Sequence, residues 1–270
     1  MSTARWNQAF TVAVIDMRRM VGQRRVIGLV VLAAIPICLT LLRAVFLPDG
    51  VRLDVNRAAT ELATVFYVLQ LRFVVFFGCA FVFVRSLRGE ILDRSLHFAL
   101  LAPVRREVLA VGKYLGAVAV SSLVLVCSTF MMVVLMYLAH GVGPTIATLG
   151  SVKGLSHLAS YVFATLLACI GYGAIFFLAG MFFRSPMVPA AVYLGFELVA
   201  PYLGPTIGAF SMARHFRALL PVHLSLGPFD AAVTTPAWLA TLGLLAVSVA
   251  ALTVAAFRAR SLEVTYAGDD

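Results

Sequence analysis

Long apolar runs are the feature that most constrains the fold of this chain. Several of them reach or exceed the roughly 20 residues that an α-helix needs to cross a bilayer. Only 12% of the 270 residues are charged, whereas a soluble domain carries about 25%, and the mean hydropathy is +1.00. The sequence lacks the alternating segments of roughly 10 residues that build a membrane β-barrel. It therefore predicts an all-α membrane protein.

The apolar runs predict six transmembrane helices in one domain, residues 26–257. They cover residues 26–46, 62–84, 114–137, 158–182, 188–207 and 237–257. A polar cytosolic tail, residues 258–270, follows the last of them. The outer segment 211–236 is too polar to span the membrane. It is expected either as a short re-entrant hairpin or as a surface loop, because irregular backbone at membrane depth must be covered by protein or line a wet cavity.

The N-terminal residues 1–25 predict an amphipathic helix. Large apolar side chains recur at steps of three and four on one face, and arginines occupy much of the rest of its second half. The apolar positions are Trp6, Phe10, Val14, Met17 and Val21. A tryptophan-bearing apolar stripe beside a cationic face fits a helix that lies in the membrane interface. A short cytosolic helix that packs on the protein is the alternative.

The distribution of positive charge predicts the orientation of the spans. With the N-terminus inside, the cytoplasmic segments hold fourteen of the 21 Lys and Arg residues, and the outer segments hold six. Lys and Arg collect on the cytoplasmic side of inserted proteins, so both termini are expected in the cytoplasm. The formal net charge of +9 follows this bias and does not indicate a nucleic-acid partner.

Cysteine and histidine residues do not form a recognisable site in the sequence. Cys38, Cys79, Cys127 and Cys169 all fall inside predicted spans and form no CxxC pair, so neither a disulfide framework nor a zinc site is expected. Small core residues are the better interpretation. The histidines do not show the spacing of three or four converging ligands. No metal and no cofactor is therefore expected in this chain.

The segment 85–113 is the longest basic segment between two long apolar runs. Six of its residues are Lys or Arg, and three are acidic. Residues 89–101 contain no proline and predict a short helix that ends before Pro103. Such a helix between two spans can pack its apolar side on the bundle and offer its charged side to a partner. The simpler alternative is that the charges solvate a loop and set the orientation.

The order of residues in this segment resembles the signature of the ABC-2 type permease family, the membrane subunits of ABC exporters. The matching residues are Gly89-Glu90-Ile91, Leu100-Leu101-Ala102-Pro103, Arg105-Arg106 and Gly112-Lys113. The resemblance extends to the N-terminal amphipathic helix, the six spans and the proline-bearing segment between the last two spans.

This resemblance implies a dimeric exporter permease in the lipids of a bacterial-type inner membrane, paired with a second copy or a homologue. A separate ABC ATPase subunit, which would hold ATP and Mg, is expected to dock on the cytosolic coupling helix between the second and third spans. The implied docking residues are Glu90, Asp93, Arg94, His97, Arg105 and Arg106. The chain itself has no G-x-x-x-x-G-K-[ST] motif, so we expect it to be a permease subunit and not an enzyme.

Two charged residues fall near the middle of predicted spans. Arg72 lies in the second span and Glu197 in the fifth, where an isolated charge costs a few kcal/mol or more. In the resembled family these spans face the dimer axis and the substrate path, which implies that both residues line a translocation path. A buried structural ion pair is the alternative.

Two other classes of function stay open at this point. A membrane-embedded enzyme would act without nucleotide, although the H-E-x-x-H and G-x-S-x-G motifs are absent. A polytopic membrane assembly factor would have no transport role. Copurification with a nucleotide-hydrolysing partner would distinguish the permease from both.

Overall fold

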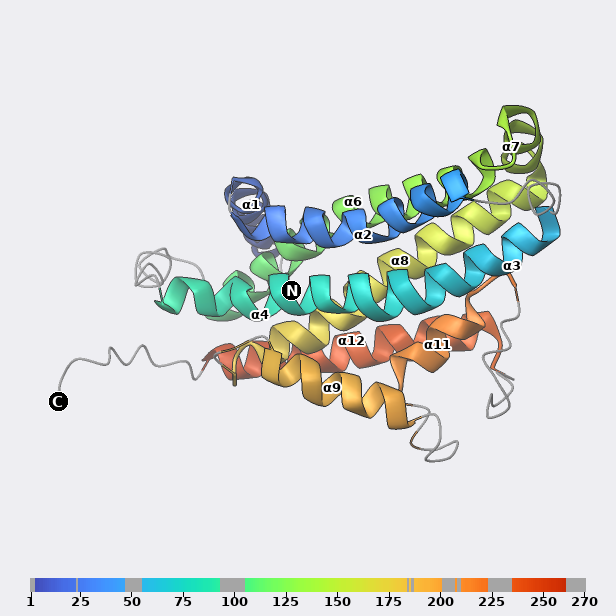
Figure 1. Ribbon diagram of the computed structural model, residues 1–270. Helices are drawn as coiled ribbons and strands as arrows, with labels where there is room; N and C mark the ends of the chain where they lie inside the picture. Colours follow the sequence, from blue (N-terminus) through green and yellow to red (C-terminus); the bar gives the residue numbers. More distant parts are fainter. Residues whose placement is uncertain are drawn as a thin grey trace.

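The computed structural model describes residues 3–22, 24–46, 55–92, 105–183, 185, 187–200, 207, 210–222 and 235–260. The regular elements within these ranges are all helices, which confirms the all-α prediction (Figure 1). They are α1 (Thr3–Val21), α2 (Arg24–Phe46), α3 (Val55–Val65), η1 (Phe66–Val75), α4 (Phe76–Leu92), α6 (Arg106–Leu138), α7 (Val142–Leu149), α8 (Val152–Ala179), α9 (Met187–Val199), α11 (Met212–Ala218) and α12 (Ala237–Arg260).

Five segments of the described chain are long and apolar enough to cross a membrane. They are Val26–Phe46, Ala58–Ser86, Arg106–Leu138, Val152–Ala179 and Ala237–Ala259. The chain is therefore a multi-pass membrane protein, as predicted. The predicted fifth span, 188–207, is described only in part. The helix α9 covers its first part with 13 residues, fewer than the roughly 20 needed to cross a bilayer, and residues 201–206 lie outside the described ranges.

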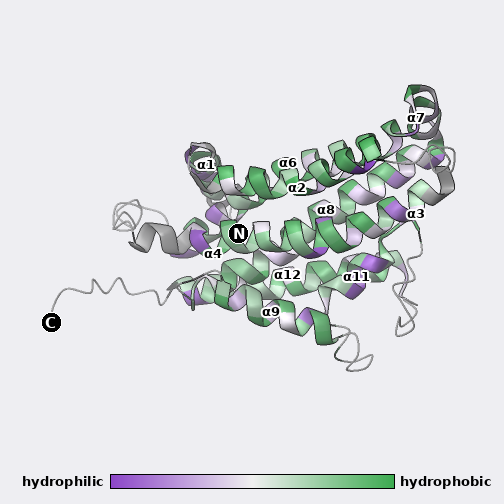
Figure 2. Cartoon of the chain, viewed as in Figure 1, coloured by the Kyte–Doolittle hydropathy of each residue, from purple (hydrophilic) through white to green (hydrophobic). Residues whose placement is uncertain are grey.

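The long helices lie side by side as a bundle, and α1 lies across one end of it (Figure 1). In that view α1 is seen almost along its axis, while the long helices run across the picture. The start of α2 and the ends of α4, α8 and α12 lie at the end of the bundle that carries α1, and α7 lies at the opposite end. Figure 2 shows apolar residues along the outward faces of the long helices, as expected for surfaces in contact with lipid.

The second and third spans extend further than the sequence predicts. The second continues without interruption from Val55 through η1 and α4 to Leu92, instead of covering only 62–84. The third begins at Arg106 instead of Tyr114. A helix that continues past the bilayer can carry charged residues there, so hydropathy alone predicts a helix that is too short. Residues 85–92 and 106–113 of the predicted coupling segment are therefore parts of α4 and α6.

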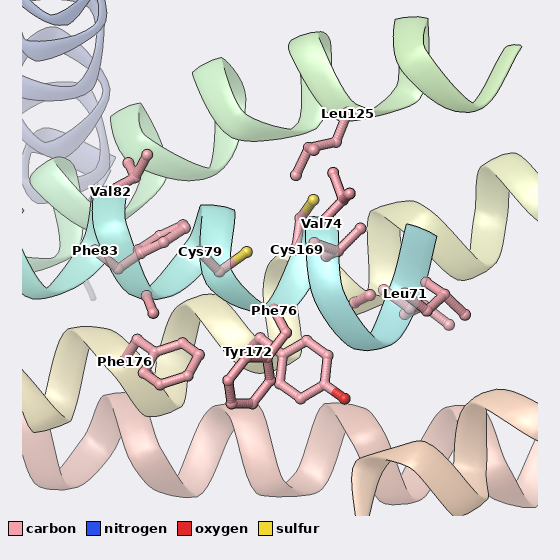
Figure 3. Close-up of a cluster of buried hydrophobic side chains, with 14 of the residues drawn as sticks. Leu71, Val74, Phe76, Cys79, Val82, Phe83, Leu125, Cys169, Tyr172 and Phe176 are labelled. Atoms are coloured by element: carbon pink, nitrogen blue, oxygen red, sulfur yellow. The ribbon is translucent and has the colours of Figure 1, made fainter. Parts of the chain in front are cut away.

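The centre of the bundle is a core of aromatic and aliphatic side chains between α4, α6 and α8 (Figure 3). Cys79 and Cys169 are fully buried in this core, which confirms their predicted role as small core residues. Cys38 and Cys127 are exposed on the surface of the bundle instead.

Polar side chains inside the bundle form hydrogen bonds between neighbouring helices. Gln70 Nε2 donates to Thr129 Oγ1 at 3.1 Å, and the Thr129 and Thr165 hydroxyls share a hydrogen bond at 3.0 Å. Ser128 Oγ donates to the carbonyl oxygen of Ala33 at 2.7 Å. Lipid offers no hydrogen-bond partners, so these bonds tie η1, α2, α6 and α8 together. Gln70 belongs to the π-helical stretch η1, a rare geometry that is frequent at functional sites.

The helix α1 packs against the first turns of α6 through small residues. A Cβ atom added at Gly112 would lie 2.8 Å from the carbonyl oxygen of Ala9, and one added at Gly116 would lie 2.9 Å from that of Ala13. Both alanines are buried. Glycine at these two positions allows the backbones of the two helices to approach closely.

The face of α1 that packs on α6 is not the predicted apolar stripe. Trp6 and Phe10 of that stripe are 53% and 69% exposed. The packed face lies beside the stripe and includes Asp16 and Met20, which are buried. The helix therefore contacts the protein through one face and leaves Trp6 and Phe10 of the stripe exposed, while Met17 of the stripe packs against the core.

Candidate functional site

The structure has two separate short helices, α9 and α11, after α8, and the backbone of Ser211, just before α11, is extended. We call the end of α9 and the start of α11 the break. The helix α9 ends at Val199, and α11 begins at Met212. The two helices follow one another on the way from the end of α8 to the start of α12 (Figure 1). A helix end leaves up to four backbone N–H or C=O groups without intrahelical partners. At membrane depth each such group costs several kcal/mol unless other groups satisfy it.

The Glu197 carboxylate accepts hydrogen bonds from the free backbone N–H groups at the start of α11. Its Oε1 accepts a hydrogen bond from the Met212 N–H at 2.8 Å, and its Oε2 accepts one from the Ala213 N–H at 3.1 Å. The Ser211 hydroxyl donates a third bond to Oε2 at 2.6 Å. The side chain is only 3% exposed. A carboxylate suits this position because charge-assisted hydrogen bonds are stronger than neutral ones, and a negative charge is favoured at a helix N-terminus.

Arg72 donates a hydrogen bond to a backbone carbonyl group at the end of α9. It lies in η1, midway along the membrane-spanning segment Ala58–Ser86. Its Nη2 donates a hydrogen bond to the carbonyl oxygen of Glu197 at 3.4 Å. That carbonyl is among the last four of α9, which have no partner within the helix. A cation is favoured at this end of a helix. Arg72 therefore bonds to the end of α9, and Glu197 bonds to the start of α11.

The ring of Tyr67 brings a second arginine to the break. The guanidinium of Arg72 lies 5.4 Å from the centre of this ring, and that of Arg217 on α11 lies 6.0 Å from it. Both distances fall within the range of a cation–π interaction. The Tyr67 hydroxyl donates a hydrogen bond to the carbonyl oxygen of Ala213 at 3.4 Å. Tyr67 therefore links η1 to α11.

Aromatic side chains pack the break against the rest of the bundle. The ring of Tyr172 on α8 lies 5.2 Å from that of Phe76, 6.2 Å from that of Tyr193 and 5.4 Å from that of Phe216. These rings belong to α4, α8, α9 and α11. Phe216 is fully buried, so this part of the predicted outer segment 211–236 lies inside the bundle.

The structure brings the two predicted intramembrane charges together. The contact joins the Arg72 guanidinium to the backbone carbonyl of Glu197, while the Glu197 carboxylate bonds to α11. Within the described ranges no carboxylate lies at ion-pairing distance from Arg72, so the alternative of a direct ion pair is not the arrangement seen here. The sequence did not point to Tyr67, Ser211 or Arg217. Pro201, Gly204 and Pro205 were the sequence signals that could have indicated a break.

The predicted docking residues lie at the end of the bundle that carries α1, where the structure describes them. Arg105 and Arg106 are exposed at the start of α6. Glu90 lies in the last turn of α4, and its side chain is outside the described part. Asp93, Arg94 and His97 lie outside the described residues altogether.

A buried ion pair lies close to this end of the bundle. The Nζ of Lys113 on α6 is 3.5 Å from Oδ1 of Asp16 on α1. Their side chains are only 4% and 9% exposed. Two charges this deeply buried compensate one another, and removing either of them is destabilising because the other stays buried. The pair therefore ties α1 to the membrane-spanning helix that follows the predicted docking segment.

No protein-family model matches the chain, and no curated protein matches it. Among the residues that the structure describes, no three His, Cys, Asp or Glu side chains come together as metal ligands. Within the described part of the chain, the break held by the buried Glu197 and the partly buried Arg72 is the candidate functional site.

Proposed function

We propose that this chain is the membrane-spanning permease subunit of a transporter, driven by a separate ATP-binding subunit. The observation that carries the proposal is the pair of short helices α9 and α11 with the contacts of Glu197 and Arg72 at their ends. We take the two helices as one interrupted crossing. A continuous helix satisfies its own backbone in lipid, whereas broken helices are tolerated only where protein covers them or a wet cavity adjoins them. Interrupted helices whose ends meet near the centre of the membrane are typical of transport proteins.

The course of the chain supports six crossings with both termini on one side. The helix α8 ends at the end of the bundle that carries α1, and α12 begins at the opposite end (Figure 1). The chain between them must return through the bundle, and α9 and α11 in series provide that sixth crossing. In this proposal α1 lies in the cytoplasmic interface, with Trp6 and Phe10 facing lipid.

The proposed contact with the ATP-binding subunit is the segment 85–113. Its two arms are the end of α4 and the start of α6, and both reach the end of the bundle across which α1 lies. Arg105 and Arg106 are exposed at the start of α6, and we propose that they are part of this contact. Glu90, Asp93, Arg94 and His97 complete the proposed contact on the basis of the family resemblance. The same resemblance supports a dimer of this chain and the direction of export.

Purification of the chain from its native membrane tests this function. We expect a P-loop ATPase to copurify, and we expect Glu90→Arg and Arg94→Glu each to weaken that association. The matched control is Lys153→Glu, because Lys153 is an exposed charge at the start of α8, at the opposite end of the bundle. The control is expected to keep the partner.

Two results would contradict the proposal. One is a preparation of the folded chain that never contains a nucleotide-hydrolysing protein. The other is labelling of Arg94→Cys by a membrane-impermeant thiol reagent added outside intact cells, since the docking segment would then face the wrong side of the membrane.

A further inference from the structure

An apolar groove of about 430 Å³ lies between α2, α4 and α9. Its volume falls in the range of roughly 300 to 1,000 Å³ that is typical of small-molecule sites. Side chains of all three helices line it, among them Leu29, Leu32, Phe77, Phe81, Ala191 and Leu194. No charged side chain belongs to its described lining, so the groove itself suits a hydrocarbon chain.

The α9 wall of the groove ends close to the residue that Arg72 contacts. Leu194 of the groove wall precedes Glu197 by three residues of α9, about 4.5 Å along the helix axis. The carbonyl oxygen of Glu197 is the atom that Arg72 contacts, at 3.4 Å. On the opposite wall, Phe77 stacks on Phe73 with ring centres 6.2 Å apart, and Phe73 is the neighbour of Arg72 in the chain. The α9 wall and the η1–α4 helix therefore both continue from the groove toward the part of the bundle that holds Arg72.

Arg72 has hydrogen-bonding capacity that its described surroundings do not use. A guanidinium carries five N–H donors, and Arg72 makes one hydrogen bond, to a backbone carbonyl, among the described residues. The nearby carboxylate of Glu197 already accepts three hydrogen bonds from Ser211 and the start of α11. Charge complementarity at Arg72 therefore favours an anion.

The geometry points to a binding site for a membrane amphiphile that carries one anionic group. Its apolar chain occupies the groove between α2, α4 and α9, and its carboxylate or phosphate binds the Arg72 guanidinium. Lipid tails are as apolar as the groove, so burial of the chain alone gives little preference over ordinary lipid. Selectivity must then come from the charge. The interpretation of this amphiphile as the transported cargo rests on the proposed transport function, whereas the binding itself does not.

Photolabelling of the purified full chain in phosphatidylcholine nanodiscs tests the site. The probe is a palmitic acid analogue with a diazirine in its chain, and the matching alcohol is the uncharged control. At mildly alkaline pH we expect the acid to label peptides of α2, α4 and α9 about tenfold more strongly than the alcohol, which is the scale of one hydrogen bond to a charged group. No ATPase is present, so this result is independent of whether an ATP-binding partner exists.

Three variants locate the two parts of the ligand. Arg72→Gln is expected to reduce labelling by the acid to the level of the alcohol and to leave labelling by the alcohol unchanged, which also shows that the variant is folded. Ala191→Trp fills the groove and is expected to reduce labelling by both probes. Lys153→Gln removes a distant exposed charge and is expected to change neither.

The inference is overturned if acid and alcohol label the wild-type chain equally, or if Arg72→Gln keeps the preference for the acid. Labelled peptides confined to other helices would overturn it as well. Full competition by inorganic phosphate would also overturn it, because the site would then bind a free anion and not an amphiphile.

Discussion

The substitution Glu197→Gln tests how the break between α9 and α11 is held. The amide keeps the shape of the side chain but replaces one acceptor oxygen by an NH₂ donor. In one orientation that donor faces the Ala213 N–H, and in the other it faces the Met212 N–H. The Ser211 hydroxyl can reverse its bond and accept, but a backbone N–H cannot. Either orientation therefore leaves one buried backbone donor unsatisfied.

The expected cost follows from these three bonds. An unsatisfied buried donor costs about 1–3 kcal/mol, and the loss of charge on the remaining bonds adds about 1 kcal/mol. We therefore expect Glu197→Gln to lower the free energy of unfolding by about 2–4 kcal/mol, as measured by titration with a denaturing detergent and followed by circular dichroism. Hydrogen exchange in the α11 peptide is expected to accelerate roughly thirtyfold or more, because this segment opens locally before the whole bundle unfolds.

The matched control is Glu61→Gln, which makes the same chemical change at a more accessible ion pair. Glu61 pairs with Arg43, and their side chains are 32% and 21% exposed. Such a pair contributes little, so the control is expected to cost at most about 1 kcal/mol. Equal losses for the two variants, or unchanged protection of the α11 peptide in Glu197→Gln, would refute the role assigned to the carboxylate.

Two further predictions concern the contact between α1 and α6. Gly112→Ala places a methyl carbon 2.7 Å from the Cβ of Val12 and is expected to lower the free energy of unfolding by about 1–3 kcal/mol. Gly195→Ala meets no atom within 4 Å and is expected to raise it slightly, because alanine is favoured over glycine in helices. Detergent titration compares the two, and equal effects would argue against a close approach of the helices. Lys113→Met leaves the Asp16 carboxylate buried and is expected to cost about 3–5 kcal/mol, most of which the double substitution Asp16→Leu/Lys113→Met should restore. A double-mutant cycle measures the coupling, and strictly additive losses would show that the pair contributes nothing.

The sequence predicted the continuous apolar helices well. The expected spans 26–46 and 237–257 agree closely with α2 and α12. These helices are apolar on nearly every side, so their composition changes sharply where they leave the bilayer. The starts of α3 and α6 were missed because their first turns are amphipathic or charged and resemble a loop in hydropathy.

The break was harder to predict than the spans. The run 188–207 stays apolar as far as Ile207, so hydropathy predicts one continuous helix there. Hydropathy does not report backbone hydrogen bonding, and a proline such as Pro201 or Pro205 has no N–H to donate but does not make the run polar. The π-helical stretch η1 cannot be recognised from hydropathy for a similar reason, since a change in backbone hydrogen-bond partner leaves the composition unchanged. Arg72 and Glu197 could be selected as candidate residues because each is an isolated charge in an apolar run. That Arg72 bonds to α9 and Glu197 to α11 could be seen only in the structure.

The way the break is held also bears on how such a bundle could move. The seven residues of α11 are fixed at their start by one carboxylate and along their length by Tyr67 and Tyr172. Those partners come from α9, η1 and α8, so any displacement of one of these helices changes the environment of α11 directly. A continuous helix at the same place would satisfy its own backbone and would not depend on its neighbours. In our proposal this dependence allows work done on the cytoplasmic ends of α4 and α6 to alter the break, because α4 and η1 form one uninterrupted helix that carries both Arg72 and Tyr67.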